Sequence, residues 1–145
     1  MRYTEIDLQI EDIMWFGIDR NGFVFSCTTA GIGNVPEFVC RSKEETEKLY
    51  DFFSAKLSDK ADYSLNVKKE DNDLINEAIA LAKKGVFCFD AVVDDNHYGE
   101  YRKISSPNTP LSYRTLPLEI QNIIGNHQID IDVIQSNMLS IPHAY

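Results

Sequence analysis

The stretch MWFGIDRNGFVFSCTT, residues 14–29, decides the fold. Two apolar, aromatic-rich runs, Met14–Ile18 and Phe23–Thr28, flank the polar segment Asp19–Gly22. Asn-Gly between such runs is typical of a tight β-turn, because both residues accept the positive φ that the turn requires. The pattern therefore predicts a β-hairpin, and with it a sheet against which the rest of the chain can pack.

Two helices are predicted downstream of this hairpin. The first starts at Ser42, which has the spacing of a capping box with Glu45, each side chain accepting a hydrogen bond from the other residue's backbone N–H. Its apolar residues recur at helical spacing at Leu49, Phe52, Phe53 and Leu57. The second helix lies within residues 70–85 and ends at Gly85, with acids at its front and lysines at its back. Its predicted buried face consists of Leu74, Ile75, Ala78, Ile79 and Ala82.

A second hairpin is predicted after these helices. Val86–Val93 is nearly continuous in apolar residues, which is typical of a central strand covered on both faces. The polar segment Asp94–Gly99 is the predicted turn, and Tyr101–Ile104 is the returning strand. Pro107 and Pro110 then indicate a loop.

The C-terminal part predicts one more helix and one more strand. Residues 116–125 form the predicted helix, with Pro117 in its first turn and Gly125 at its end. Residues 128–135, QIDIDVIQ, alternate polar and apolar side chains and predict a last, half-exposed strand. Two segments stay open: residues 5–10 could be an edge strand or a short helix, and the connection 58–69 could contain a short strand at YSLNV.

The order of these elements predicts the fold class. It reads strand pair, helix, helix, strand pair, helix, strand, which favours a single α+β domain over residues 1–145. We expect a mainly antiparallel sheet with two to three helices packed on one face. A chain of 145 residues is long enough for one hydrophobic core.

Charge and composition restrict the class of partner. The net charge is −9, from 14 basic and 23 acidic residues, and the basic residues are dispersed along the chain. Nucleic acid is therefore disfavoured, whereas a basic protein surface is a better electrostatic match. No run approaches the roughly 20 apolar residues that cross a bilayer. The start MRYTEIDLQIED lacks the apolar core of a signal peptide, so we expect a cytoplasmic protein without a membrane partner. The sequence carries no indication of oligomeric state.

The glycine-rich loop Gly31–Glu37 has the start of a phosphate-binding motif. Its G-x-G-x-x has Pro36 in place of the third glycine, and proline also lacks the backbone N–H that a phosphate would use. No Lys-Ser/Thr pair follows, as it would in a P-loop. We interpret the loop as structural, with Gly31 and Gly33 allowing positive φ, Pro36 starting a helical turn and Glu37 as its one charged side chain.

Metal and catalytic motifs are incomplete. Asp94–Gly99, DDNHYG, starts like a calcium loop, but Ser105 stands where the bidentate Glu would be. The cysteines Cys27, Cys40 and Cys88 contain no C-x-x-C pair, and the three histidines share no metal-ligand spacing. His97 could pair with Glu100 or with Cys88, but such pairs are recognised by geometry. No catalytic, cofactor-binding or metal-binding residue is therefore assigned, and enzymatic activity stays an open alternative.

Acidic and tyrosine residues form a candidate partner surface. If the 94–99 turn and the last strand lie on one side, an acidic patch results from Asp94, Asp95, Tyr98, Glu100, Tyr101, Asp130 and Asp132. Acids with tyrosines suit recognition of a cationic protein. The alternative is that these residues are simply solvated turns and strand faces.

Three segments carry a family resemblance: WFGIDRNGFVFSCTTAGIGNVPEFV (residues 15–39), YRKISSPNTPL (101–111) and LPLEIQNII (116–124). They resemble a group of small bacterial immunity or immunity-like proteins found beside polymorphic toxins. In that pattern an aromatic hairpin runs into a Gly-rich loop closed by Val-Pro-Glu. The matching residues are Trp15, Asp19, Gly22, Gly33, Pro36 and Glu37. The resemblance implies a protein that neutralises a toxin, and it supplies no catalytic residues.

Three functional hypotheses follow. The first is a non-enzymatic immunity protein that neutralises a toxin, such as a nuclease with a basic active-site cleft, through an acidic surface. The second is a small-molecule-binding domain or enzyme, with a pocket walled by Trp15, Phe16 and the Gly31–Glu37 loop. The third is a housekeeping interaction protein with no toxin partner.

Overall fold

The hairpin at residues 14–28 is confirmed in the computed structural model, which describes residues 1–60 and 62–145. Strands β1 (Met14–Ile18) and β2 (Val24–Thr28) pair antiparallel along their whole length. The turn differs from the expected one, because Gly22 has a positive φ (82°) and Asn21 does not. The Asp19 backbone accepts from Gly22 N–H and donates to the Phe23 carbonyl, which makes a three-residue loop closed by a left-handed glycine.

The sheet has the strand order β1-β2-β4-β5-β3, and β6 pairs with β5. The remaining strands are β3 (Tyr63–Leu65), β4 (Phe87–Ala91), β5 (Tyr101–Pro107) and β6 (Met138–Leu139). All pairs are antiparallel except β2–β4, which is parallel. Parallel neighbours need a long crossover, and here it contains two long helices. The expected α+β fold with a mainly antiparallel sheet is confirmed, and β4 is its central strand.

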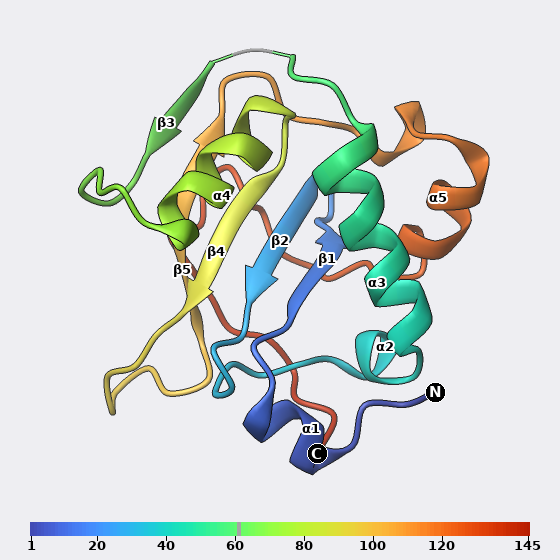
Figure 1. Ribbon diagram of the computed structural model, residues 1–145, viewed down its shortest axis with the longest axis vertical. Coiled ribbons are helices and arrows are strands. Elements are labelled where there is room, and N and C mark those ends of the chain that lie inside the picture. Colours follow the sequence, from blue (N-terminus) through green and yellow to red (C-terminus); the bar gives the residue numbers. More distant parts are fainter. Residues whose placement is uncertain (61) are drawn as a thin grey trace.

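Three helices cover one face of the sheet, as expected. They are α3 (Lys43–Asp51), which continues as a π-helical turn over Phe52–Lys56, α4 (Asp73–Lys83) and α5 (Leu118–Ile124). Figure 1 shows α3 in front of β1 and α4 in front of β4 and β5, and these pairs are in contact. Two short helices, α1 (Glu5–Ile10) and α2 (Glu37–Cys40), and a 3-10 turn at Tyr113–Thr115 complete the described elements.

Side-chain caps set the helix starts. The Ser42 hydroxyl accepts from Glu45 N–H at 3.1 Å, so α3 begins where the motif predicts. The reciprocal bond of a capping box is absent there, because the Ser42 N–H donates to the Val39 carbonyl instead. A complete capping box forms between Thr4 and Asp7. Residues 5–10, for which the sequence left strand and helix open, are therefore a helix.

Two expectations are wrong here, one for the buried face of α4 and one for the strand at residues 128–135. Leu74 is 38% exposed, whereas Leu81 is buried, because the inner face of α4 is centred on Ile75, Ala78 and Ala82. Residues 128–135 form no strand but an irregular segment with one bridge, between Gln128 and Ile18. In a strand, the backbone N–H groups of this segment would donate to a neighbouring strand, but here they donate to carboxylates. Asp19 accepts from the Val133 N–H, and Asp132 accepts from the N–H groups of Ile134 and Gln135.

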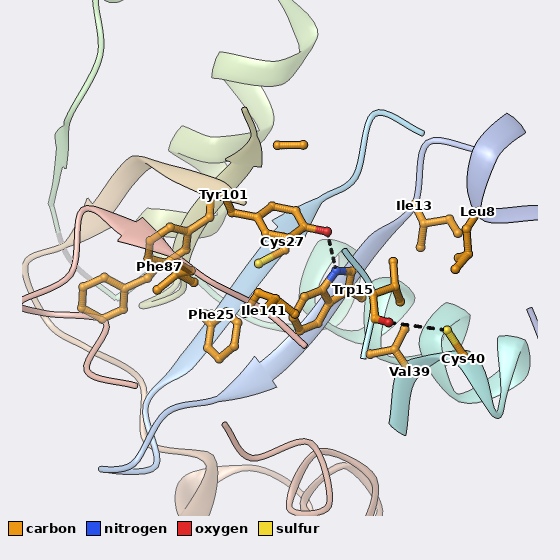
Figure 2. Close-up of a cluster of buried hydrophobic side chains, with 14 of the residues drawn as sticks. Leu8, Ile13, Trp15, Phe25, Cys27, Val39, Cys40, Phe87, Tyr101 and Ile141 are labelled. Carbon is orange, nitrogen blue, oxygen red and sulfur yellow. Dashed lines mark hydrogen bonds between the residues drawn. The ribbon is translucent and has the colours of Figure 1, made fainter. Parts of the chain in front are cut away.

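The core has two parts, one on each face of the sheet. Alternate strand residues such as Phe16 and Cys88 pack under the helices, and their neighbours Trp15 and Phe87 pack on the other face. Figure 2 shows the second part, where Trp15 lies between Tyr101 and Val39. The C-terminal segment covers this face through Val133, Leu139 and Ile141. Each buried large side chain contributes about 1.5–3 kcal/mol to stability. Within the described parts of the chain, no helix is long and apolar enough to span a bilayer.

Candidate functional site

The backbone of the Gly31–Glu37 loop is hydrogen-bonded to other segments of the protein. The Tyr101 hydroxyl donates to the Asn34 carbonyl at 2.6 Å. The Val35 N–H donates to Nδ1 of the His143 ring at 2.9 Å, and the Val35 carbonyl accepts from the Ala144 N–H. A phosphate would need backbone N–H donors, and these are already paired: the Asn34 N–H donates to the Gly99 carbonyl at 2.9 Å and the Val35 N–H to His143. These contacts support the interpretation of the loop as structural.

The four loop residues have different roles. Gly31 has φ +73°, as expected, but Gly33 has no positive φ. Gly33 is required for another reason: a Cβ there would lie 2.4 Å from the Tyr101 hydroxyl oxygen. Pro36 precedes α2 and its carbonyl accepts from Val39 N–H, as expected for the start of a helical turn. The Glu37 carboxylate forms a two-bond pair with the Arg2 guanidinium at 2.5 and 2.6 Å.

The pocket proposed beside this loop is not open. Trp15 and Phe16 are 0% and 1% exposed, and they lie in the core on opposite faces of the sheet. Consecutive strand residues point to opposite faces, so the two side chains cannot wall one pocket. The expectation for these two residues is wrong.

The seven predicted partner-surface residues do not form one surface. Asp94, Asp95 and Tyr98 are exposed in the β4–β5 loop, and Glu100 is half-buried beside them. Tyr101 is fully buried, so its inclusion is wrong: the side chain packs against Trp15.

The two remaining acids of that set come from the irregular segment. Asp130 pairs with Arg20 in the β1–β2 turn at 3.2 Å, and Asp132 caps its own turn. The β1–β2 turn lies at the opposite end of the sheet from the β4–β5 loop, because β2 and β4 run parallel and the turn precedes β2 while the loop follows β4. The condition for a joint patch is therefore not met.

The candidate catalytic groups are not brought together. Cys88 is buried against α4, with its sulfur 3.7 Å from the Ala78 carbonyl oxygen, and burial raises the pKa of its thiol to about 11. His97 is exposed and lies 3.1 Å from the Asp94 carboxylate, which it holds at a lowered pKa. Burial also raises the pKa of Cys27 and that of Cys40, the latter to about 11. Reactive cysteines need the opposite shift, so these thiols have a structural environment.

A different site is present between α3 and α4. A cleft of about 700 Å³ opens there over the start of β1 and the end of β2. Five of its lining residues are acidic: Glu11, Asp12, Glu47, Asp51 and Glu77. The others are Tyr3, Ile13, Met14, Thr28, Thr46 and Tyr50. A volume of this size is typical of ligand-binding pockets.

Interactions between the two helices hold the walls of the cleft. The Tyr50 hydroxyl of α3 donates to the Glu77 carboxylate of α4 at 2.8 Å. Beyond the cleft, the buried Lys84 ammonium at the end of α4 donates to the carbonyls of Phe53 and Ser54 at 2.9 and 2.8 Å. The helices that face each other across the cleft are thus tied at two levels, which favours a pre-formed site.

The potential in the cleft is negative. No lysine or arginine is among the described residues that line it. Burial, followed by the nearby carboxylates of Glu47 and Glu11, raises the pKa of Tyr3 to about 12. Lys43 lies over the Tyr3 ring at 5.2 Å, but its ammonium is paired with Asp7 at 3.1 Å. Since the carboxylates around the cleft carry like charges, a cationic ligand between them would be stabilised.

Sequence reasoning missed this cleft. Its residues come from five separate parts of the chain, and only Glu47 and Asp51, one helical turn apart, carry a local signal. None of the residues assigned from the sequence to a partner surface lines it. Within residues 1–60 and 62–145, no three His, Cys, Asp or Glu side chains are grouped closely enough to hold a metal ion.

His127 is a buried group outside the cleft. It is 1% exposed, its ring stacks on Phe38, and its Nδ1 lies 3.0 Å from the Phe16 carbonyl oxygen. Its Nε2 has no hydrogen-bond partner among the described residues. Burial therefore lowers the pKa of His127 below its ordinary 6.5.

We expect His127 to make the protein less stable at mildly acidic pH. The unfolded chain binds a proton near pH 6.5 and the folded chain binds it only at lower pH, so the contribution is complete above 6.5 and is lost as the pH falls below it. One proton gives a slope of at most about 1.4 kcal/mol per pH unit. Urea unfolding at pH 7.5, 6.5 and 5.5 measures it, and His127→Asn should flatten the profile. An unchanged profile in the variant would contradict the assignment to His127.

The chain was also compared with known proteins. Models of protein families, curated proteins and solved structures gave no match to it.

Proposed function

We propose that the protein is a non-enzymatic binding protein whose acidic cleft accepts a cationic segment of a partner protein. One observation carries the proposal: five carboxylates face a cleft of about 700 Å³ that has no lysine or arginine in its lining. Like charges around one opening repel one another, and a cation placed between them lowers this repulsion. A partner that supplies that charge gains both affinity and a faster encounter.

We further propose that the partner is a toxin with a basic active-site cleft, which the protein neutralises as an immunity protein. The net charge of −9 supports attraction to a basic partner. The resemblance of residues 15–39 to immunity-like proteins supports a toxin as that partner. A nuclease carries basic segments that bind phosphate anions, and an acidic cleft that accepts such a segment would keep it from the nucleic acid.

The charge of the cleft is the variable to test. We expect the triple variant Glu11→Gln, Glu47→Gln, Asp51→Asn to bind an octa-arginine peptide about 10–100-fold more weakly than the wild type. These side chains are exposed and lie in the lining, so their neutralisation leaves the core intact. Isothermal titration calorimetry at 50 mM salt measures the affinity, and added salt should weaken wild-type binding.

The matched control neutralises three acids in the β4–β5 loop: Asp94→Asn, Asp95→Asn and Glu100→Gln. It changes the net charge by the same amount but leaves the cleft untouched, so it should keep the wild-type affinity. Equal losses in both variants would mean that only net charge matters, and a loss confined to the control would place binding at the loop. Either result overturns the proposal for the cleft.

The toxin partner is tested by co-expression with the product of the adjacent gene. The wild type and the loop control should restore growth of the host, and the cleft variant should not. No complex and no rescue by the wild type would overturn the immunity function while leaving the peptide result to decide on the cleft.

A further inference from the structure

The backbone ladder between β3 and β5 uses every second residue of β3. The Asp62 carbonyl accepts from the Asn108 N–H at 2.9 Å, just beyond the end of β5. The Asn66 N–H donates to the Ile104 carbonyl at 2.9 Å, and Ser64 lies between these two bonds in the same register. The backbone groups of Asp62, Ser64 and Asn66 therefore face β5, because successive residues of a paired strand alternate in direction.

The backbone groups of Tyr63 and Leu65 point away from β5, out of the sheet. Within residues 1–60 and 62–145, no hydrogen bond reaches their N–H or C=O groups. Figure 1 shows β3 at the outer edge of the sheet, and it is in contact with α4. An edge strand with free N–H and C=O groups is a template for pairing with another strand.

The side chains at this edge alternate between the two faces of the sheet. Tyr63 and Leu65 are half-buried on the side of the helices, where Leu65 packs against the core and Lys83 Nζ of α4 lies 5.9 Å from the centre of the Tyr63 ring. Ser64 and Asn66 are exposed on the other face. A strand that continues the sheet here needs apolar side chains on the helix side and polar ones opposite.

A second copy of β3 meets this requirement when it runs antiparallel. With a two-fold axis at Ser64, Tyr63 of each copy lies opposite Leu65 of the other. Each of these pairs exchanges both N–H···O bonds, so all the free groups of the edge become paired. On the helix side an aromatic ring then faces a leucine, and on the exposed face Ser64 meets its own copy, which are favourable cross-strand pairs.

The charges that flank β3 also suit this arrangement. They are Asp59, Lys60 and Asp62 before the strand, and Lys68, Lys69, Glu70 and Asp71 after it. Antiparallel pairing brings Asp62 of one copy towards Lys68 of the other, and the two-fold axis repeats this contact. A parallel pairing would instead place Asp62 beside Asp62 and Lys68 beside Lys68, and like charges opposite one another are destabilising.

We propose that β3 is a homodimer interface, through which two copies of the chain form one continuous sheet about a two-fold axis at Ser64. Such two-fold dimers are the commonest closed oligomers. The paired edge is short, so we expect a weak dimer with a dissociation constant of about 10–100 µM. Tyr63, Ser64 and Leu65 do not line the acidic cleft, so the dimer is independent of the proposed function.

A single cysteine tests the position of the axis. Ser64→Cys places two thiols at a non-hydrogen-bonded pair, where the Cα atoms are about 4.5 Å apart and a disulfide fits. We expect a covalent dimer on a non-reducing gel after treatment with oxidised glutathione. Asn66→Cys is the matched control, because it is exposed on the same face but lies opposite Asp62 and away from its own copy. The native cysteines are buried.

Sedimentation equilibrium measures the dimer without a cross-link. The wild type should change from monomer to dimer between about 1 µM and 1 mM. Leu65→Pro removes an outward N–H and leaves the ladder to β5 in place, since proline is tolerated on an edge strand. Ser64→Lys puts like charges on the axis through an exposed side chain. Each variant should weaken the dimer about tenfold or more, and thermal unfolding checks that both remain folded.

The other outcomes would overturn the proposal. A wild type that stays monomeric up to about 1 mM has no such interface. A dimer that persists in Ser64→Lys and Leu65→Pro lies at another surface. Cross-linking of Asn66→Cys that equals that of Ser64→Cys would rule out the axis at Ser64. Octa-arginine binding reports on the cleft separately, so these results leave the proposed function to its own tests.

Discussion

Replacing Asp19 with Ala is expected to lower the free energy of unfolding by about 3–5 kcal/mol. The Asp19 side chain is fully buried, and its two oxygens accept from the backbone N–H groups of Asn21, Phe23 and Val133 at 2.9–3.0 Å. Without the carboxylate, three backbone donors lose their acceptor, and each buried one costs about 1–3 kcal/mol. The same side chain closes the β1–β2 turn and holds the irregular C-terminal segment, so both should loosen together.

Urea unfolding followed by tryptophan fluorescence measures this loss. Asp130→Ala is the matched control, because Asp130 is an acid of the segment that Asp19 holds and, among the described residues, is paired only with the exposed Arg20 guanidinium. Exposed pairs contribute about 0–1 kcal/mol, so this variant should stay close to the wild type. Asp19→Asn, which keeps one acceptor oxygen, should fall between the two. A loss at Asp19→Ala no larger than at Asp130→Ala would contradict the role given to this carboxylate.

Gly33→Ala is expected to destabilise the protein by about 1–3 kcal/mol or more through overpacking. The added Cβ would lie 2.4 Å from the Tyr101 hydroxyl oxygen and 2.5 Å from its Cζ. Tyr101 cannot move aside easily, because its hydroxyl donates to Asn34 O and accepts from Trp15 Nε1 at 3.3 Å. Figure 2 shows this contact between Tyr101 and Trp15 in the core.

A double-mutant cycle with Tyr101→Leu tests the cause. If the methyl group collides with the tyrosine ring, the double variant should lose less than the sum of the two single losses. Additive losses would mean that Gly33→Ala acts elsewhere. The cycle also tests the corrected role of this glycine, which is a close approach of two chain segments and not a positive φ.

Elements governed by local chemistry are predictable from the sequence. The hairpin follows from the two aromatic runs around Asp19–Gly22. The start of α3 follows from the Ser42 hydroxyl, and the end of α4 follows from Gly85, because each acts on residues within a few positions. The apolar run before Asp94 likewise predicts the central strand, because such runs are typical of strands covered on both faces. The strand is shorter than the run, since it ends at Ala91 and Val93 is 79% exposed.

Long-range contacts override local patterns elsewhere. The alternation in residues 128–135 is typical of a strand, yet the buried Asp19 carboxylate takes the Val133 N–H and the segment stays irregular. Tyr101 begins the predicted returning strand beside a polar turn, but strand pairing directs its side chain into the core beside Trp15 and not to the acidic surface. Neither partner lies within 80 residues of the residue it controls, so no local pattern contains the information.

By its sequence alone the chain is determined to be an acidic α+β protein with a hairpin, two capped helices and a central strand. The tertiary structure decided where the acids meet. The cleft exists because α3 and α4 lie on the same face of the sheet, α3 against β1 and α4 against β4 and β5, and the start of β1 and the end of β2 contribute to its lining. Solvated acids carry no periodic apolar signal, and their separation along the chain says nothing of their distance in space. Only the packing of the helices brings Glu47, Asp51 and Glu77 to the same opening.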